Sequence, residues 1–332
     1  MIVDVVMLVV SLGMILLASV VFTNGIEMIG ARCKLHQGVV GSILAAVGTA
    51  LPETIIPVIA ILFFHSAESH QVGIGAIAGA PFMLGTLAFF ITGLAVLIYA
   101  GLGRRTKTIH TDVHGLTRDL SFFLGLYGVA ILASFFHEHQ AFKIAVGIGL
   151  VVGYLWYIRV TLTSDGHEIE NVDLLHFNRY LGLPETLPVI IIQVIASLAL
   201  MIWGAHLFVG YVSSVSVTLG ISAMILSIII TPIATELPEK CNSVIWMGKR
   251  KDILAMGNIT GAMVFQSSFP VAFGVVFTAW DLTGVPLVSA LLAFTSAAIL
   301  LFWIRWKRAL NPFILMGGGV FYIAFIIYLL LR

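Results

Sequence analysis

The stretch Thr49-Ala50-Leu51-Pro52-Glu53 is nearly repeated as Thr235-Glu236-Leu237-Pro238-Glu239, and each copy lies within a long apolar segment. A charged residue at the centre of a bilayer costs about 2.5–3.5 kcal/mol on insertion scales. Two carboxylates that recur in matching apolar surroundings therefore indicate that Glu53 and Glu239 serve a function.

The composition indicates an integral membrane protein. Of 332 residues, 60% are hydrophobic and 10% are charged, which leaves no water-soluble domain of any size. The first apolar run carries Asp4 and no basic leader, so we expect it to be retained as a helix. Apolar runs long enough to cross about 30 Å of hydrocarbon predict ten spans. They lie near residues 2–23, 37–64, 72–100, 120–136, 141–163, 185–209, 215–247, 253–279, 285–304 and 311–331. The predicted fold class is an all-α membrane protein.

Lysine and arginine alternate between the two predicted sides of the membrane. One side receives only Lys143 and Arg332. The other side collects Arg32, Lys34, Arg104, Arg105, Lys107, Arg118, Arg159, Arg179, Lys249, Arg250, Lys251, Arg305, Lys307 and Arg308. Because basic residues in short loops stay in the cytoplasm, we expect both termini outside the cell, in a protein of the plasma membrane. The net charge of +1 gives no reason to expect a nucleic-acid partner.

The internal repeat extends beyond the pentapeptide. An offset of 186 (235 − 49) aligns the two motifs, and an offset of 182 (257 − 75) then aligns Gly75–Ala80 with Gly257–Ala262. The repeat predicts halves at residues 1–163 and 185–332, joined by a cytoplasmic linker at 164–184. Five spans in each half is an odd number, so the halves must have opposite orientations. Inverted repeats are typical of secondary transporters with a binding site near the midplane.

Proline explains why each motif is expected to interrupt its helix. Pro52 and Pro238 lack an N–H and should leave the carbonyls of Gly48 and Ala234 without a helical partner. Irregular backbone at this depth must face a cavity or a cation.

The threonine and glutamate of each motif are four residues apart and can share a helical face. Four carboxylate oxygens and two threonine oxygens would nearly complete the shell of six to eight oxygens that Ca²⁺ takes. We therefore predict a cation site formed by Thr49, Glu53, Thr235 and Glu239. The Gly75-xxx-Gly79 and Gly257-xxx-Gly261 patterns should let the following helices approach the broken ones closely.

The motifs resemble the alpha repeats of the cation/calcium antiporter superfamily, which read roughly Gly-Thr-Ser-Leu-Pro-Glu and then Gly-Asn-x-x-Gly-Ser-Asn. This resemblance implies ten helices in two inverted halves of the sodium/calcium exchanger type. It also implies one central cation site and exchange of Ca²⁺ against Na⁺ or H⁺ by alternating access. By position, Thr49, Glu53, Thr235 and Glu239 match the calcium-coordinating residues of that family.

The chain also departs from the family pattern. The serines expected in the four motif segments are replaced by Ala50, Glu236, Ala80 and Ala262. At a later position where an amide or carboxylate is usual, the first half has Leu84 and the second has Gln266. Since side chains associated with flanking sodium sites are missing, the resemblance favours protons over several sodium ions as the counter-ion.

Two interpretations of Glu236 remain open. If it faced the cavity, it would add a third carboxylate, and two unit charges about 5 Å apart repel by roughly 3 kcal/mol at an effective dielectric near 20. Such a site would tend to take up a proton and could couple proton flow to transport. Alternatively, Glu236 could form an ion pair with Lys240, four residues later.

The sequence contains no phosphate-binding loop, no nucleophile with a base and no Cys/His metal-site spacing, so we expect neither an enzyme nor a cofactor. The expected partners are small inorganic cations and the lipid bilayer, for a monomer or weak homo-oligomer. A monovalent or other metal cation/proton exchanger remains an alternative, as does a non-transporting membrane scaffold.

Overall fold

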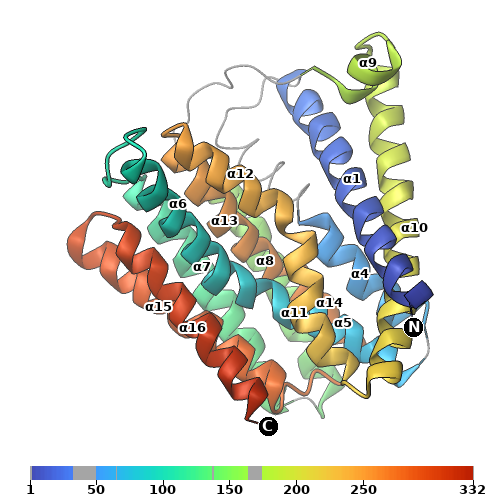
Figure 1. Ribbon diagram of the computed structural model, residues 1–332. Helices are drawn as coiled ribbons and strands as arrows, with labels where there is room; N and C mark the ends of the chain where they lie inside the picture. Colours follow the sequence, from blue (N-terminus) through green and yellow to red (C-terminus); the bar gives the residue numbers. More distant parts are fainter. Residues whose placement is uncertain (1, 33–49, 65, 137, 164–173, 332) are drawn as a thin grey trace.

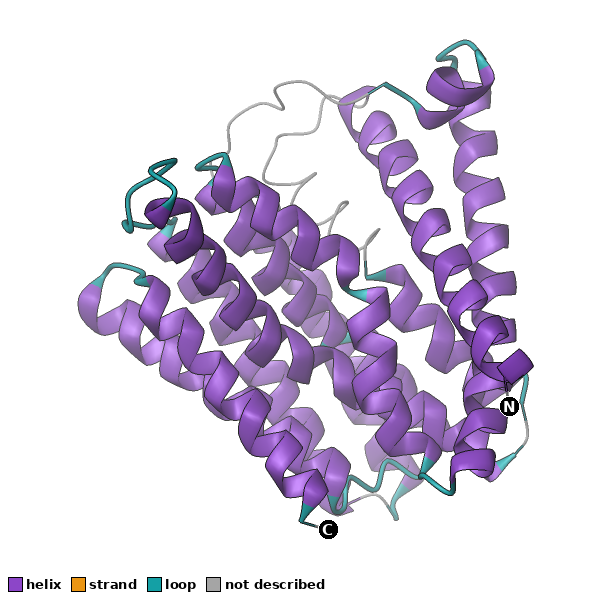
Figure 2. Cartoon of the chain, viewed as in Figure 1, coloured by secondary structure: helices purple, strands orange, loops and turns teal. Residues whose placement is uncertain are grey.

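The computed structural model describes residues 2–32, 50–64, 66–136, 138–163 and 174–331 (Figures 1 and 2). Within these ranges the regular structure is helical, apart from a single backbone bridge between Ile109 and Leu310. The prediction of an all-α protein is confirmed for this part of the chain.

The first half of the chain begins with one long helix and continues with shorter elements. They are α1 (Ile2–Arg32), α4 (Leu51–Leu62), α5 (Ala67–Met83), the π-helical turn η2 (Leu84–Ala88), α6 (Phe89–Gly101), α7 (Val113–Ala133), the 3₁₀ turn η3 (Ser134–Phe136) and α8 (Gln140–Leu162).

The second half follows a short helix, α9 (His176–Leu181), that belongs to the region between the halves. Its elements are α10 (Leu187–Leu219), α11 (Ala223–Thr235), α12 (Leu237–Gly248), α13 (Asp252–Gln266), α14 (Phe269–Phe277), α15 (Val285–Lys307) and α16 (Pro312–Leu330).

Eight helical stretches of the described chain are long and apolar enough to cross a membrane, and they coincide with eight of the ten predicted spans. The second and seventh predicted spans only partly overlap helices of the described chain, the shorter apolar helices α4 and α11, so the count of ten spans stays a prediction. The start of the second predicted span, residues 37–49, lies outside the described residues.

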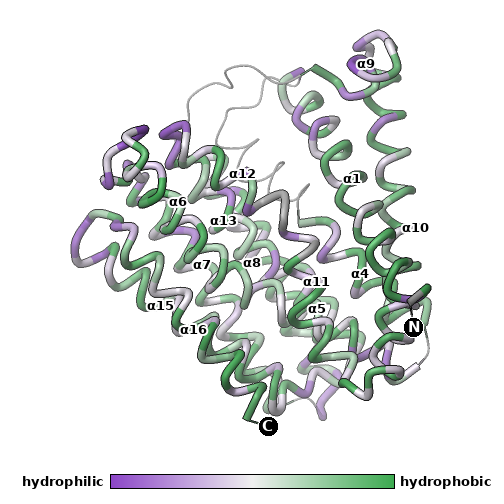
Figure 3. The backbone as a smooth tube through the Cα atoms, viewed as in Figure 1, coloured by the Kyte–Doolittle hydropathy of each residue, from purple (hydrophilic) through white to green (hydrophobic). Residues whose placement is uncertain are grey.

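The corresponding first helices of the two halves run side by side in opposite directions, as an inverted repeat requires (Figure 1). α1 begins and α16 ends at the same end of the bundle. The α6–α7, α12–α13 and α15–α16 connections gather at the opposite end, where Figure 3 shows hydrophilic residues. The three loops rich in lysine and arginine therefore lie at the opposite end of the bundle from the start of α1 and the end of α16, as predicted.

Two apolar cores hold the bundle together. The larger core joins α5 through α8 to α11 through α16 and contains Phe82, Phe123 and Phe265. The smaller core joins the α1/α10 pair to α4 and α5, and Ile15 and Phe208 are fully buried in it. The α1/α10 pair thus packs against the rest of the bundle through a core of its own.

Candidate cation-binding site

The two motif helices begin with the same backbone geometry. Ala50 precedes α4 with φ −86° and ψ 4°, and Glu236 precedes α12 with φ −87° and ψ 7°. Pro52 and Pro238 lie in the first turns of these helices, where a missing N–H costs nothing. The predicted interruption is confirmed in the seventh span, because α11 ends at Thr235 and α12 starts at Leu237.

A second pair of distortions follows in the next span of each half. The π-helical turn begins at Leu84, and α13 ends at Gln266, which is the matching position at the offset of 182. Isolated π-turns are frequent at functional sites. Leu84 and Gln266 therefore mark equivalent departures from regular α-helical geometry in the two halves.

Glu53 and Thr235 are both buried, with 1% of each residue exposed. Glu53 lies in the first turn of α4, and Thr235 closes α11, a helix that contacts α4. The Thr235 hydroxyl donates to the carbonyl oxygen of Thr231 at 2.8 Å, so its lone pairs remain available to a cation. A carboxylate at this depth is costly unless it is paired or holds a cation.

Part of the predicted site falls outside the described structure. Gly48 and Thr49 lie in the undescribed segment 33–49. The backbones of Ala234 and Glu239 lie in α11 and α12, but their side chains are outside the described part. The assignment of Thr49 and Glu239 as ion ligands, and of Gly48 and Ala234 as cavity residues, stays a prediction.

Glu236 forms the ion pair that its spacing from Lys240 suggested. Lys240 Nζ lies 2.9 Å from Glu236 Oε2, and the two side chains are 6% and 0% exposed. The same ammonium group donates to the carbonyl oxygen of Pro232 at 3.1 Å. A role for Glu236 in coupling proton flow to transport stays a prediction. Any such role would have to be played by a carboxylate that is paired with Lys240.

The Gln266 side chain is buried at the end of α13, with 1% of the residue exposed. Within the described chain, neither its amide nitrogen nor its amide oxygen has a hydrogen-bond partner. Leaving buried polar atoms unpaired costs about 1–3 kcal/mol, and such groups recur where a water or an ion binds. This observation supports Gln266 as a residue of the cation cavity.

The small face of α5 permits very close contact with α11. A Cβ atom built on Gly75 would lie 2.7 Å from the Met224 carbonyl oxygen, and one on Gly79 would lie 2.6 Å from that of Ile228. The expected close approach is confirmed for this copy. It brings the third span of the first half against the broken span of the second.

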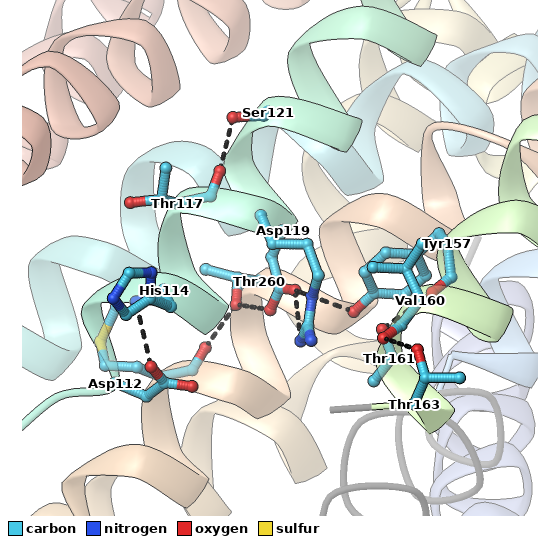
Figure 4. Close-up of polar contacts among 12 residues, drawn as sticks. Asp112, His114, Thr117, Asp119, Ser121, Tyr157, Val160, Thr161, Thr163 and Thr260 are labelled. Atoms are coloured by element: carbon cyan, nitrogen blue, oxygen red, sulfur yellow. Dashed lines mark hydrogen bonds and ion pairs between the residues drawn. The ribbon is translucent and has the colours of Figure 1, made fainter. Parts of the chain in front are cut away.

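Sequence reasoning missed a buried carboxylate, Asp119 on α7 (Figure 4). Its Oδ2 accepts a 2.8 Å hydrogen bond from Thr260 on α13, and its Oδ1 accepts one from the Tyr157 hydroxyl on α8 at 3.2 Å. Arg118 also contacts Oδ1, at 3.0 Å. Asp119 thereby fixes the helix that carries Gln266. Its only sequence signal was a carboxylate one residue before a predicted apolar run.

A second buried ion pair joins two of the basic loops. Arg105 binds both carboxylate oxygens of Asp252, at 2.7 and 2.8 Å, and donates to the carbonyl oxygens of Met247 and Thr108. The His110 amide donates to the same carboxylate at 2.9 Å. The α6–α7 loop is therefore clamped to the start of α13.

The sequence profile of the family described as "Sodium/calcium exchanger protein" matches residues 3–163 and 189–332. The chain belongs to the sodium/calcium exchanger family. It is similar to the inner membrane protein YrbG of Escherichia coli, with 23% identity over 298 residues, 88% of this chain and 86% of YrbG. It is also similar to the uncharacterized membrane protein MJ0091 of Methanocaldococcus jannaschii, with 23% identity over 80% of each chain.

Two solved structures show the same fold. The H⁺/Ca²⁺ exchanger CAX aligns with a TM-score of 0.74 at 15% identity, over 99% of this chain and 86% of CAX. The sodium-calcium exchanger NCX_Mj aligns with a TM-score of 0.61 at 19% identity, over 98% of each chain. The predicted membership of the cation/calcium antiporter superfamily and the exchanger-like fold are confirmed.

Proposed function

We propose that this protein is a secondary antiporter that exchanges Ca²⁺, or a related divalent cation, for protons or sodium ions. The cation would bind between the two broken helices, held by Glu53 and Glu239 with oxygens of Thr49 and Thr235. The observation that carries this proposal is the full burial of Glu53 in the first turn of α4, a helix whose starting backbone geometry at Ala50 recurs at Glu236 in the other half. Carboxylate, hydroxyl and carbonyl oxygens are the hard ligands that Ca²⁺ prefers.

The departures from the family pattern bear on the counter-ion. Hydroxyl groups are absent at Ala50, Ala80 and Ala262, and Leu84 provides no amide. At the remaining position, Glu236 is paired with Lys240. Fewer side-chain oxygens are therefore available to sodium ions, which favours protons, or few sodium ions, as the exchanged species.

The packing of the bundle supports alternating access. α1 and α10 pack along one another and meet the rest of the protein through the smaller core. A pair of helices with its own core can shift as a unit against the larger body, which opens the central site first to one side and then to the other.

At one end, a buried polar network joins this pair to α9. Gln193 on α10 donates to Val21 O at 2.9 Å and to Asn24 Oδ1 at 3.0 Å, both on α1. The side-chain oxygen of Gln193, Oε1, accepts a hydrogen bond from the backbone amide of Phe177 on α9 at 2.8 Å. The network would make α1, α10 and α9 move together.

The two ends of the bundle also bear on the orientation of the protein in the membrane. We propose that the end with the basic loops faces the cytoplasm of a plasma-membrane protein and that both termini are outside. The partners would be small inorganic cations and lipid, and no cofactor is needed beyond the transported ions. We propose a monomer or weak homo-oligomer.

The assignment of Glu53 can be tested by ⁴⁵Ca²⁺ uptake into proteoliposomes under imposed sodium or proton gradients. Glu53→Gln keeps the shape of the side chain and removes its charge, so we expect exchange to be lost while the protein still folds. Glu68→Gln makes the same chemical change at an exposed position in the first turn of α5 and should leave uptake intact. Full uptake by the Glu53 variant would refute the central site.

A further inference from the structure

We propose that the Lys240 ammonium group is a built-in cation that occupies a cation position at the break between α11 and α12. In that place it would prevent a transported monovalent ion from binding beside Glu236. Lys240 would then be a specificity-determining residue of the exchanger. The inference rests on the proposed function and deepens it, because it specifies that no monovalent cation binds beside Glu236.

The position has the ligand chemistry of a monovalent cation site. Nζ lies 2.9 Å from a carboxylate oxygen of Glu236 and 3.1 Å from the carbonyl oxygen of Pro232. Pro232 belongs to the last turn of α11, and the carbonyls at the C-terminal end of a helix attract cations. Half-helix ends of this kind coordinate Na⁺ or H⁺ in transporters with broken helices.

Burial distinguishes this pair from an ordinary surface ion pair. The Lys240 and Glu236 side chains are 6% and 0% exposed, so water cannot replace either partner. A buried ion pair is weak evidence for a role in stability, because well-packed apolar residues of similar size often stabilise a protein as well or better. Glu236 follows Thr235 directly and Lys240 follows Glu239 directly, so each member of the pair is the sequence neighbour of a predicted ion ligand.

The pair also sets the charge of the site. Lys240 and Glu236 cancel, so the two glutamates predicted to hold the cargo, Glu53 and Glu239, leave a total of −2. One divalent cation balances this charge, and so do two monovalent cations. Exchange of one for the other moves no net charge across the membrane. Without the ammonium group the site would carry −3 and could accept a third monovalent ion.

The test is ²²Na⁺ binding to the purified full-length protein, with choline as the reference cation. Lys240→Met removes the ammonium group and keeps a long unbranched side chain. We expect Na⁺ binding to tighten on the order of a hundredfold, because the vacated position leaves the Glu236 carboxylate to attract the ion, and opposite unit charges about 5 Å apart attract by roughly 3 kcal/mol at an effective dielectric near 20.

Two control variants isolate the charge. Lys240→Arg keeps a cation in place and should not gain Na⁺ binding. The double variant Glu236→Gln, Lys240→Met replaces the neutral pair by another neutral pair, and it should not gain Na⁺ binding either. A gain in the double variant as large as in Lys240→Met would overturn the proposal, as would a folded Lys240→Met protein without any gain.

Folding of the single variant gives a second readout. If Lys240→Met is unstable in choline, Na⁺ should raise its Tm because the ion replaces the missing ammonium group. Equal instability in Na⁺ and choline would overturn the proposal.

The binding assay does not depend on transport. If the wild-type protein did not exchange Ca²⁺, the proposed function would be contradicted. The comparison of Na⁺ binding between the wild type and Lys240→Met would still test the role of Lys240. Where the wild type does exchange Ca²⁺, its flux should be independent of a clamped membrane potential. A flux that carries a net charge in each cycle would contradict the assigned role of Lys240.

Discussion

Replacing Gly79 by alanine should displace α11 and weaken cation exchange. The added Cβ would lie 2.6 Å from the Ile228 carbonyl oxygen, 2.9 Å from Ile228 Cα and 2.9 Å from Pro232 Cγ. Ordinary contact begins at 3.4 Å, so the helices must separate by 3.4 − 2.6 = 0.8 Å. Because the obstructing atoms belong to backbone and to a proline ring, no side-chain rotation can relieve the contact.

The cost can be estimated from two opposing effects. Overpacking in a close-packed interior costs about 1–3 kcal/mol. Alanine gains about 1 kcal/mol over glycine in helix propensity, so we expect a net loss of up to about 2 kcal/mol. The effect on exchange should be larger than the effect on stability, because α11 ends at Thr235 and carries the Pro232 carbonyl that holds Lys240.

The assay pairs thermal unfolding with ⁴⁵Ca²⁺ uptake. Gly125→Ala on α7 is the matched control, since a Cβ there meets nothing within 4 Å. We expect Gly79→Ala to lower the Tm and the apparent Ca²⁺ affinity, while Gly125→Ala leaves uptake unchanged. Identical Tm and affinity in the two variants would refute the claim that the α5–α11 contact positions the site.

Three further predictions concern buried polar contacts elsewhere in the bundle. Arg105→Met should lower stability by about 3–5 kcal/mol because it strands the Asp252 carboxylate, and a double variant with Asp252→Leu should recover part of the loss in chemical unfolding. Thr260→Val should cost about 1–3 kcal/mol by removing the donor to Asp119, and Thr260→Ser should restore the Tm. Gln193→Leu should speed hydrogen exchange at the Phe177 amide and slow transport, whereas unchanged exchange there would contradict the docking of α9 on the α1/α10 pair.

The sequence predicted the features of the fold that depend on local chemistry. Proline beside a glutamate in an apolar run marks a helix break, and the break before Leu237 lies where the motif predicts it. The glycines of α5 likewise predicted a close helix contact, because a missing Cβ has a direct steric meaning. The i, i+4 spacing offered the Lys240 ion pair as one of two interpretations of Glu236, and this ion pair is present in the structure.

Contacts between distant residues could not be predicted in this way. Asp119 meets Thr260 only because α7 packs on α13, and Arg105 meets Asp252 only because a loop folds back over the start of α13. Neither pair has a local spacing that marks it. Gln193 gave no sign that it joins three helices, since a buried amide in an apolar helix has the same sequence pattern whichever partners it finds.

The most direct test of the antiporter proposal is Ca²⁺ efflux from loaded proteoliposomes of the wild-type protein at zero membrane potential. An inward proton gradient would be compared with an inward sodium gradient. We predict efflux driven by at least one of the two gradients, stronger with protons, and loss of this efflux in Glu53→Gln. Absence of efflux under both gradients, in a folded and inserted protein, would contradict the proposal that this site exchanges Ca²⁺.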